Sequence, residues 1–424
     1  MSTLPKRAWF LQIVVFFLLL LQGTLVHAQD TEGNFLTDPK SGCTVWFKHT
    51  FTEDSVNWSG SCVNGMADGK GKMTGFTKGK QTSVYTGEMK GGKPNGEGEY
   101  IFGSERRLKG YFTEGEPLFL SPELRERLKK NIISETDEME LYAGDNNKQQ
   151  LYYHSLIPDK DIKGVIVLLP GTWETTEHVL SSMSTFCEIA YRQQLAVMVL
   201  SINQRITLTP EVVKFMNKMI DHARKKYNLP DRWVIGGFSS GGLFSLRYTE
   251  VANEDSAATA IRPMAVFSCD GPTDLTNLYQ SFTRKLKKIP GHHEATYGIR
   301  EMEEYCGGSP ETTAAKYEYY SVYSHHRQDG GNAKYLTNTP VRIYADVDPD
   351  WWIQNRQVDL YDMNALDQSA MILCLREKGN EKAEFINAFV KGYRIEGNRH
   401  PHSWSIVEPQ DCINWISASM SSNK

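Results

Sequence analysis

The sequence has little that would indicate a nucleic-acid-binding, metal-dependent or redox protein. Its 424 residues carry a formal net charge of −4, and no stretch gathers the basic residues into a stripe, so we expect no nucleic-acid partner. Neither a C-x-x-C nor an H-E-x-x-H motif occurs. Two histidine pairs, His292-His293 and His325-His326, lack the carboxylate spacing that would complete a metal site. We therefore predict no metal and no cofactor.

Long apolar runs are also scarce. The run Trp9–Leu21 follows Lys6 and Arg7, and it is too short to cross a bilayer comfortably, which takes about 20 residues. Val26-His27-Ala28 then offers the small-residue spacing of a cleavage site. We predict a signal peptide over residues 1–28 and an exported protein, located in the periplasm, the cell envelope or the extracellular medium. An uncleaved anchor is the alternative.

The cysteine content excludes a disulfide-rich scaffold. Seven cysteines are spread over a long chain, and an odd number cannot all pair within it. Cys43 and Cys62 are close enough in sequence to form a disulfide, which export would permit. The chain length indicates two or three domains.

The segment 43–115 is rich in glycine and aromatic residues and shows no helical periodicity. Residues 85–100 alternate in side-chain character and turn at Gly and Pro-Asn-Gly, which is typical of a β-hairpin. Related pieces precede and follow it. Their glycines Gly60, Gly87 and Gly110 lie 27 and 23 residues apart, which predicts a repeat whose hairpins stack.

These units resemble the MORN repeat, whose pattern is Tyr-x-Gly-x-Trp-x-x-Gly followed by a Gly-x-Gly pair. The middle copy has Met89 in place of Trp, and the first has Trp58 for Tyr and Cys62 for Trp. The resemblance implies a small all-β domain over residues 43–117 that contacts a protein or an envelope surface. The alternative is a spacer that only buries its own aromatic side chains.

A charged connector follows over residues 118–133. Leu124, Leu128 and Ile132 recur at a spacing of four, which predicts that it is helical.

Strands and helices alternate from residue 134 to 424, which predicts a doubly wound, mainly parallel sheet. The continuous apolar run Lys163–Pro170 is typical of a strand covered on both faces. Further strands are expected at 138–143, 149–156, 195–201, 233–235, 264–269, 340–345 and 383–390, and helices at 176–193, from 210, at 363–377 and after Pro409. Residues 275–339 break the alternation, and we interpret them as a partly helical cap over the mouth of the sheet.

The stretch Gly237-Phe238-Ser239-Ser240-Gly241 lies between a predicted strand and a predicted helix. A nucleophile at such a turn needs a strained backbone, and glycines two residues to either side remove the Cβ atoms that would collide there. The free N–H groups of the following helix point towards an oxyanion formed at Ser239. An ordinary glycine-serine loop is the alternative interpretation.

A serine hydroxyl needs a base and a carboxylate that orients the base. Parallel sheets place such groups on loops beyond the carboxyl ends of their strands. The segment Asp346–Asp350 follows one predicted strand and the loop with His400 and His402 follows the last one, so the chain order is serine, aspartate, histidine.

This order and the Gly-x-Ser-x-Gly turn resemble the α/β-hydrolase superfamily, over residues 134–424. The resemblance implies that Ser239 is the nucleophile and that the backbone N–H groups of Thr172 and Ser240 form the oxyanion hole. The family usually has His-Gly where this chain has Pro170-Gly171, which leaves the first of these donors less well defined. His402-Ser403-Trp404 is similar to the ending of many esterases of this fold.

The acid is harder to choose than the nucleophile. Asp348 lies nearest the usual acid position of the family, so we predict Asp348. Asp346 leaves the strand too early, and Asp350 suits a helix cap. Asp270, after an earlier strand, is an outside candidate.

For the base we predict His402 over His400, because Ser403-Trp404 repeats the ending of the family and Pro401 restricts His400 to an extended backbone. The predicted catalytic set is therefore Ser239, Asp348 and His402.

The resemblance implies an exported carboxylesterase that acts on a small-molecule ester through an acyl-enzyme. A serine peptidase of the same fold is the first alternative, since esters and amides pass through the same tetrahedral intermediate. A binding protein with an inactive hydrolase domain is the second.

Overall fold

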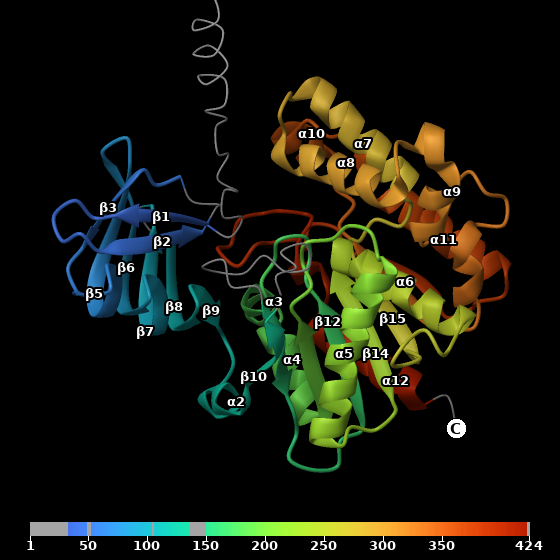
Figure 1. Ribbon diagram of the computed structural model, residues 1–424, viewed down its shortest axis with the longest axis horizontal. Helices are drawn as coiled ribbons and strands as arrows, with labels where there is room; N and C mark the ends of the chain where they lie inside the picture. The colour runs from blue at the N-terminus through green and yellow to red at the C-terminus, as the bar shows by residue number, and fades with distance from the viewer. Residues whose placement is uncertain (1–32, 49–51, 104–105, 136–149, 422–424) are drawn as a thin grey trace, which may run out of the picture. The chain divides into compact units, whose positions relative to one another are not determined.

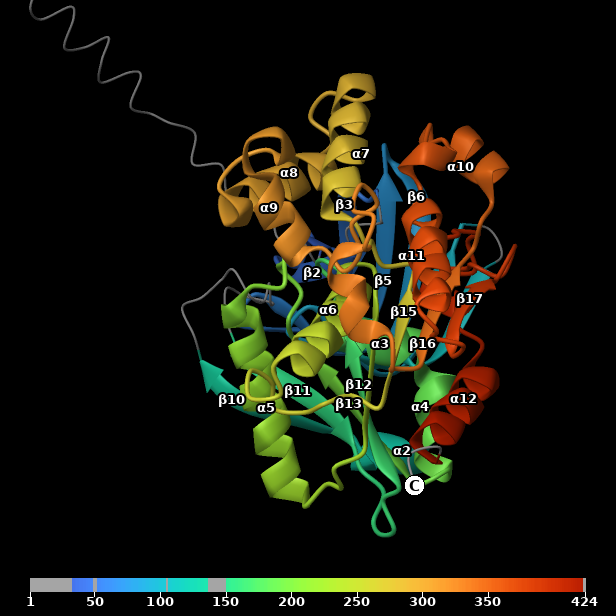
Figure 2. The ribbon, with the colours of Figure 1, turned by 90° about the vertical axis from the view of Figure 1, so that its right-hand side faces the viewer.

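The computed structural model describes residues 33–48, 52–103, 106–135 and 150–421 (Figures 1 and 2). The predicted signal peptide and the strand expected over 138–143 lie outside these residues. All of the described residues belong to one compact unit. Among the described helices, none has the length and apolar character that a membrane span requires.

A mainly antiparallel sheet, with one parallel pairing between its strands β2 and β5, occupies the first part of the described chain. It begins at residue 33, ten residues before the predicted start at 43 (Figure 1). Its strands run in the order β1-β2-β5-β6-β7-β8-β9, with β3 and β4 paired to β5. They are β1 (Gly33–Thr37), β2 (Thr44–Lys48), β3 (Ser55–Trp58), β4 (Ser61–Val63), β5 (Met66–Thr77), β6 (Lys80–Lys90), β7 (Lys93–Phe102), β8 (Arg106–Thr113) and β9 (Glu116–Leu118).

The glycines of the repeat make room for aromatic rings. Gly87 pairs with Gly98 across β6 and β7, and a Cβ atom at Gly98 would lie 2.3 Å from the hydroxyl oxygen of Tyr85. Tyr85 is buried in the core of this sheet. Consecutive hairpins pair side by side within this one sheet, and their identity as stacked MORN repeats stays a prediction. Cys43 and Cys62 form a disulfide.

The predicted helical connector is wrong over its second half. Helix α2 covers only Pro122–Arg127, and the chain from Lys129 to Glu135 is strand β10 of the second sheet. A spacing of four fits strand alternation as well as a helix, and pairing with β11 (Gln150–Leu156) decides in favour of the strand. Leu124 is buried, whereas Ile132 is 54% exposed.

The second sheet has a mixed α/β architecture with the strand order β10-β11-β13-β12-β14-β15-β16-β17 among the described residues. Beyond β10 and β11 its strands are β12 (Gly164–Leu169), β13 (Leu195–Leu200), β14 (Trp233–Phe238), β15 (Ala265–Cys269), β16 (Val341–Ala345) and β17 (Ala383–Asn387). From β13 to β17 neighbouring strands are parallel, and β10 and β11 pair antiparallel at one edge. The parallel strands lie within one or two residues of most expected ends, although β17 ends at Asn387 rather than 390.

Helices cover both faces of this sheet. Alternate residues of β12 face opposite cores: Val165 packs with the helices on one side and Ile166 with those on the other. The first side carries α5 (Pro210–Tyr227), α6 (Ser240–Glu254) and α11 (Ala365–Glu377), and the second carries α3 (Thr176–Ser182), α4 (Ser184–Arg192) and α12 (Pro409–Ser421). This two-sided burial explains why the parallel strands are continuously apolar in sequence.

The cap predicted over 275–339 is helical. It consists of α7 (Leu275–Lys288), α8 (His293–Cys306), α9 (Pro310–Tyr320) and the 3-10 turn η2 (Gly331–Leu336). Figure 2 shows α7, α8 and α9 together beyond one end of the sheet strands, with α10 (Pro349–Arg356) on the same side. The loops that follow β12, β14, β15, β16 and β17 therefore meet beneath these helices.

Candidate active site

Ser239 sits at a strained turn between β14 and α6. Its φ is 53° and its ψ −123°, a left-handed region that non-glycine residues rarely occupy. A Cβ atom on Gly237 would lie 2.1 Å from the carbonyl oxygen of Gly241, and one on Gly241 would lie 2.4 Å from that of Leu169. The two flanking glycines are thus required by close backbone contacts.

His402 is held by a carboxylate, and that carboxylate is Asp270. The His402 Nδ1 lies 2.6 Å from Asp270 Oδ2. Asp270 directly follows β15 with a φ of 49°, and its Oδ1 also accepts from the buried amide of Gln368 at 3.3 Å. Because the carboxylate accepts from Nδ1, the proton of a neutral imidazole lies on Nδ1 and the lone pair on Nε2.

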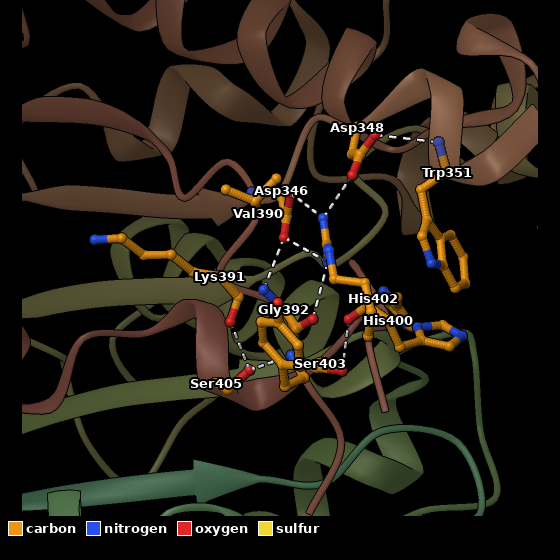
Figure 3. A network of polar contacts seen from close by, with 12 residues as sticks. Asp346, Asp348, Trp351, Val390, Lys391, Gly392, His400, His402, Ser403 and Ser405 are labelled. Carbon is orange, nitrogen blue, oxygen red and sulfur yellow. Dashed lines mark hydrogen bonds and ion pairs between the residues drawn. The ribbon is translucent and has the colours of Figure 1, made fainter. Parts of the chain in front are cut away.

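The structure contradicts Asp348 as the partner of His402. Asp348 Oδ2 instead lies 2.8 Å from Arg399 Nη2, and Asp348 Oδ1 accepts from the backbone N–H of Trp351 and so caps α10. Figure 3 shows Asp348 in contact with Trp351, and no interaction is drawn between Asp348 and His402. The sequence argument sought the partner of His402 after β16, whereas the structure places that partner after β15; an aspartate directly follows each of the two strands.

The predicted oxyanion donors lie side by side. Thr172 Oγ1 donates to Ser240 Oγ at 2.9 Å, which joins the loop after β12 to the start of α6. Among the described residues, neither the backbone N–H of Thr172 nor that of Ser240 donates to a protein acceptor. Both residues line the same cavity as Ser239, so both N–H groups are available to a developing negative charge.

Glu174 holds the loop after β12 in place through hydrogen bonds. The sequence analysis did not identify this residue. Its Oε2 accepts from the backbone N–H of Gly171 at 2.9 Å and from Trp404 Nε1 at 3.1 Å. Gly171 precedes Thr172, and Trp404 lies two residues after His402. One carboxylate thus ties the loop after β12 to the loop that carries the histidine.

His178 connects Glu174 to Glu116 of the first sheet. Its Nε2 lies 3.5 Å from Glu174 Oε1, and its Nδ1 lies 3.2 Å from Glu116 Oε2. Lys48 Nζ lies 2.8 Å from Glu116 Oε1. Burial alone would raise the pKa of Glu116, but Lys48 and His178 lower it well below the usual range. The first sheet therefore contributes charge to the support of the site.

A cavity of about 1040 Å³ opens above these groups. Ser239, Asp270, His402 and Thr172 line it, together with residues of the cap and of the first sheet. Trp173 lies with its ring 4.9 Å from that of Tyr297 on α8, so the cap packs directly on the loop after β12.

The adjacent histidine pairs have structural partners. His292 caps α8 by accepting from the N–H of Ala295, and His326 Nε2 lies 2.8 Å from Glu318 Oε1. Within the described ranges, no group of three or more His, Cys, Asp or Glu side chains could hold a metal ion.

The comparisons with known proteins come from solved structures. No family model matches the sequence, and no curated protein matches it. Carboxyl esterase 2 from the fungus Tuber melanosporum is 14% identical, with a TM-score of 0.43 over 73% of this chain and 89% of that one.

Two further similar structures are also hydrolases by their descriptions. The esterase from the archaeon Pyrobaculum calidifontis is 12% identical, with a TM-score of 0.43 over 72% of this chain and 84% of that one. The S-formylglutathione hydrolase from Agrobacterium tumefaciens is 12% identical, with a TM-score of 0.41 over 69% of this chain and 100% of that one. At these TM-scores the resemblance assigns no activity to this chain.

Proposed function

We propose that this protein is a serine hydrolase that cleaves carboxylic esters through an acyl-enzyme, with Ser239, His402 and Asp270 as its catalytic triad. One observation carries the proposal: His402 is hydrogen-bonded to Asp270 at 2.6 Å and shares a cavity with a serine whose backbone has a positive φ. A serine of this kind with an oriented imidazole is the arrangement that nucleophilic acyl transfer needs.

The first half of the reaction acylates the serine. Ser239 Oγ attacks the carbonyl carbon of the ester while His402 Nε2 takes the hydroxyl proton. Asp270 holds the Nδ1 proton and stabilises the imidazolium. The backbone N–H groups of Ser240 and Thr172 bind the negative oxygen of the tetrahedral intermediate. When the intermediate collapses, the ester C–O bond breaks and the leaving alcohol takes the proton back from Nε2.

The second half releases the acid. Water attacks the acyl carbon and gives a proton to His402 Nε2, and a second tetrahedral intermediate forms in the same oxyanion hole. Its collapse returns that proton to Ser239 Oγ and frees the carboxylic acid. Glu174 acts on neither proton, but it holds the loop of Thr172 and the loop of His402 in register.

A fluorophosphonate probe with a short-chain p-nitrophenyl ester tests this proposal. Ser239→Ala should abolish labelling and lower ester turnover by about 10⁴- to 10⁶-fold, because the nucleophile is removed. Ser240→Ala is the matched control for register: it keeps the backbone N–H and should still be labelled. Labelling of Ser239→Ala at the wild-type rate would disprove the assignment.

Export remains part of this proposal. The disulfide between Cys43 and Cys62 supports an oxidising compartment, such as the periplasm, the envelope or the medium, because cytosolic proteins rarely keep such bonds. The proposed substrate is a small-molecule ester. Contact of the first sheet with an envelope or protein surface stays a proposal supported only by its repeated hairpins.

A further inference from the structure

An arginine that forms no ion pair with any described acidic residue lines the cavity of the proposed active site. The Arg394 guanidinium carbon lies 5.9 Å from the ring centroid of Phe238, and this ring is 4.4 Å from that of His402. Phe238 directly precedes Ser239, so Arg394 stands one aromatic ring away from the reacting groups. Among the described residues, its guanidinium has no hydrogen bond or ion pair. Burial lowers the pKa of Arg394, although Glu174 and Glu396 oppose that shift.

A second arginine lies on the same wall. Arg356 Nη2 is 3.3 Å from His400 Nε2, and it has no carboxylate partner within the described part of the chain. The His400 ring packs against both Trp351 and Trp352, with ring centroids 4.9 and 5.7 Å away. Burial, Arg394, His402 and Arg356 together lower the pKa of His400 to about 2, so this histidine is neutral and adds no charge.

Arg399, in the loop after β17, is a third arginine and serves as a comparison, because its ion pairs give it a structural role. The two terminal nitrogens of Arg399 lie 2.8 Å from Asp346 and 2.8 Å from Asp348, so its charge is fully used within the protein. Arg394 lies five residues earlier and has no such acid. A half-buried cation that the fold leaves unmatched costs stability, and its cost is recovered when an anion binds.

We propose that Arg394 and Arg356 form an anion subsite, and that the natural substrate is an ester that carries a carboxylate on the part lying against them. This inference rests on the proposed function, since it concerns the substrate of the same site. Guanidinium groups suit carboxylates because their planar N–H pairs match the two oxygens. The indole rings of Trp351 and Trp352 would cover the apolar chain that links the carboxylate to the ester.

The surrounding charges favour a single negative charge over a phosphate dianion. Glu174 and Glu396 both act on Arg394, and Glu396 is only partly matched by Lys48, whose Nζ lies 3.8 Å away. Two arginines and two nearby carboxylates sum to no net charge, so the subsite offers directed guanidinium N–H groups rather than an excess of positive charge. A monoanion is therefore the better match. The test compares a carboxylate ligand with a phosphate monoester.

The experiment compares two matched esters. p-Nitrophenyl hydrogen adipate carries a free carboxylate, and p-nitrophenyl methyl adipate has the same length without the charge; the rate without enzyme is subtracted from both. We expect the ratio of kcat/KM for the acid over the methyl ester to fall about 10- to 100-fold in Arg394→Gln, because a charge-assisted hydrogen bond is lost. Arg394→Lys should retain part of the ratio.

The matched control is Lys391→Gln. Lys391 lies on the same segment, carries the same charge, is exposed and extends away from His400 and His402 (Figure 3). The Lys391→Gln variant should leave the ratio of kcat/KM for the acid over the methyl ester unchanged. This result would distinguish a local contact from a general attraction of anions. An equal fall in Lys391→Gln and Arg394→Gln would overturn the subsite, and so would no fall in either.

A binding measurement makes the result independent of turnover. Calorimetric titration of Ser239→Ala protein with monomethyl adipate should give a Kd that weakens about tenfold or more when Arg394→Gln is added, and methyl phosphate should bind more weakly than the carboxylate. A Kd that Arg394→Gln leaves unchanged, or tighter binding of methyl phosphate, would overturn the inference. Failure of the proposed function would look different: the wild type would show neither fluorophosphonate labelling nor ester turnover.

Discussion

Strands β15 and β16 are neighbours in the sheet, and each is followed at once by an aspartate with a different task. Asp270 accepts from the Nδ1 of His402, an imidazole whose other nitrogen can take up or release a proton. Asp346 accepts from the backbone N–H groups of Val390 and Gly392 and pairs with the guanidinium of Arg399. Its side chain is fully buried.

The difference shows that strand position alone does not decide the role of an acid. Both carboxylates lie at the same edge of the sheet, and the loop after β17 reaches both of them. That loop presents Arg399 to one and His402 to the other, three residues apart. A carboxylate matched by a permanent cation stabilises a loop, whereas one matched by an imidazole can support proton transfer.

The largest expected effect is on turnover, from removal of the charge at Asp270. Asp270→Asn should lower kcat/KM by about 10³- to 10⁴-fold, because an amide in this place can donate to Nδ1 and so favours the tautomer that lacks a free Nε2 lone pair. Ester hydrolysis of variant and wild type, with fluorophosphonate titration of active sites, measures this.

Asp348→Asn provides the control for that measurement. Asparagine caps a helix about as well as aspartate, and the change leaves His402 untouched, so we expect turnover close to that of the wild type. The opposite pattern, a large loss in Asp348→Asn with activity kept in Asp270→Asn, would restore the assignment made from sequence.

The second effect is on stability and concerns the loop after β16. Arg399→Met leaves the buried carboxylate of Asp346 without its cation, and breaking a buried pair in this way typically costs about 3–5 kcal/mol. Urea unfolding measures the free energy of unfolding. Arg192→Met is the matched control, because its pair with Glu188 is solvent-exposed and should contribute at most about 1 kcal/mol. Equal losses in the two variants would show that Arg399 is not the counter-charge that Asp346 needs.

Much of the second sheet could be predicted from sequence, because its signals are local. Runs such as Lys163–Pro170 are apolar on both faces, which only a covered parallel strand requires. Helix α5 begins at Pro210 with Thr209 accepting from the N–H of Val212, as the cap and proline indicate. Strand β10 was missed because a period of four is ambiguous and its pairing with β11 is not local.

The candidate site also contains one feature that a local sequence pattern predicts and others that depend on contacts between distant residues. The turn at Ser239 is a local pattern of glycines around one residue, and its strained geometry agrees with that pattern. The choice between Asp270 and Asp348 depends on which acid the loop of His402 reaches, and no local pattern encodes that contact. Asp270-Gly271 directly after a strand was the available signal. Glu174 and Arg394 act through residues distant in sequence, so only the fold reveals them.

The smallest expected effect is on stability and concerns His400, in the loop that carries both Arg399 and His402. Its pKa is lowered to about 2 by burial, Arg394, His402 and Arg356, whereas an unfolded chain has a histidine pKa near 6.5. Between these values the unfolded state binds a proton that the folded state does not, so the free energy of unfolding decreases as the pH falls below about 6.5. One such group changes it by at most about 1.4 kcal/mol per pH unit.

A comparison of the wild type with His400→Gln isolates this term, because glutamine does not titrate in either state. Urea unfolding at several pH values from 7.5 to 5 should show the wild type losing stability relative to the variant as the pH falls, with most of the divergence below 6.5. The other titrating groups cancel in the difference. A difference that stays flat over this range would mean that His400 protonates equally in both states, and that Arg356 and Arg394 do not surround it as the fold places them.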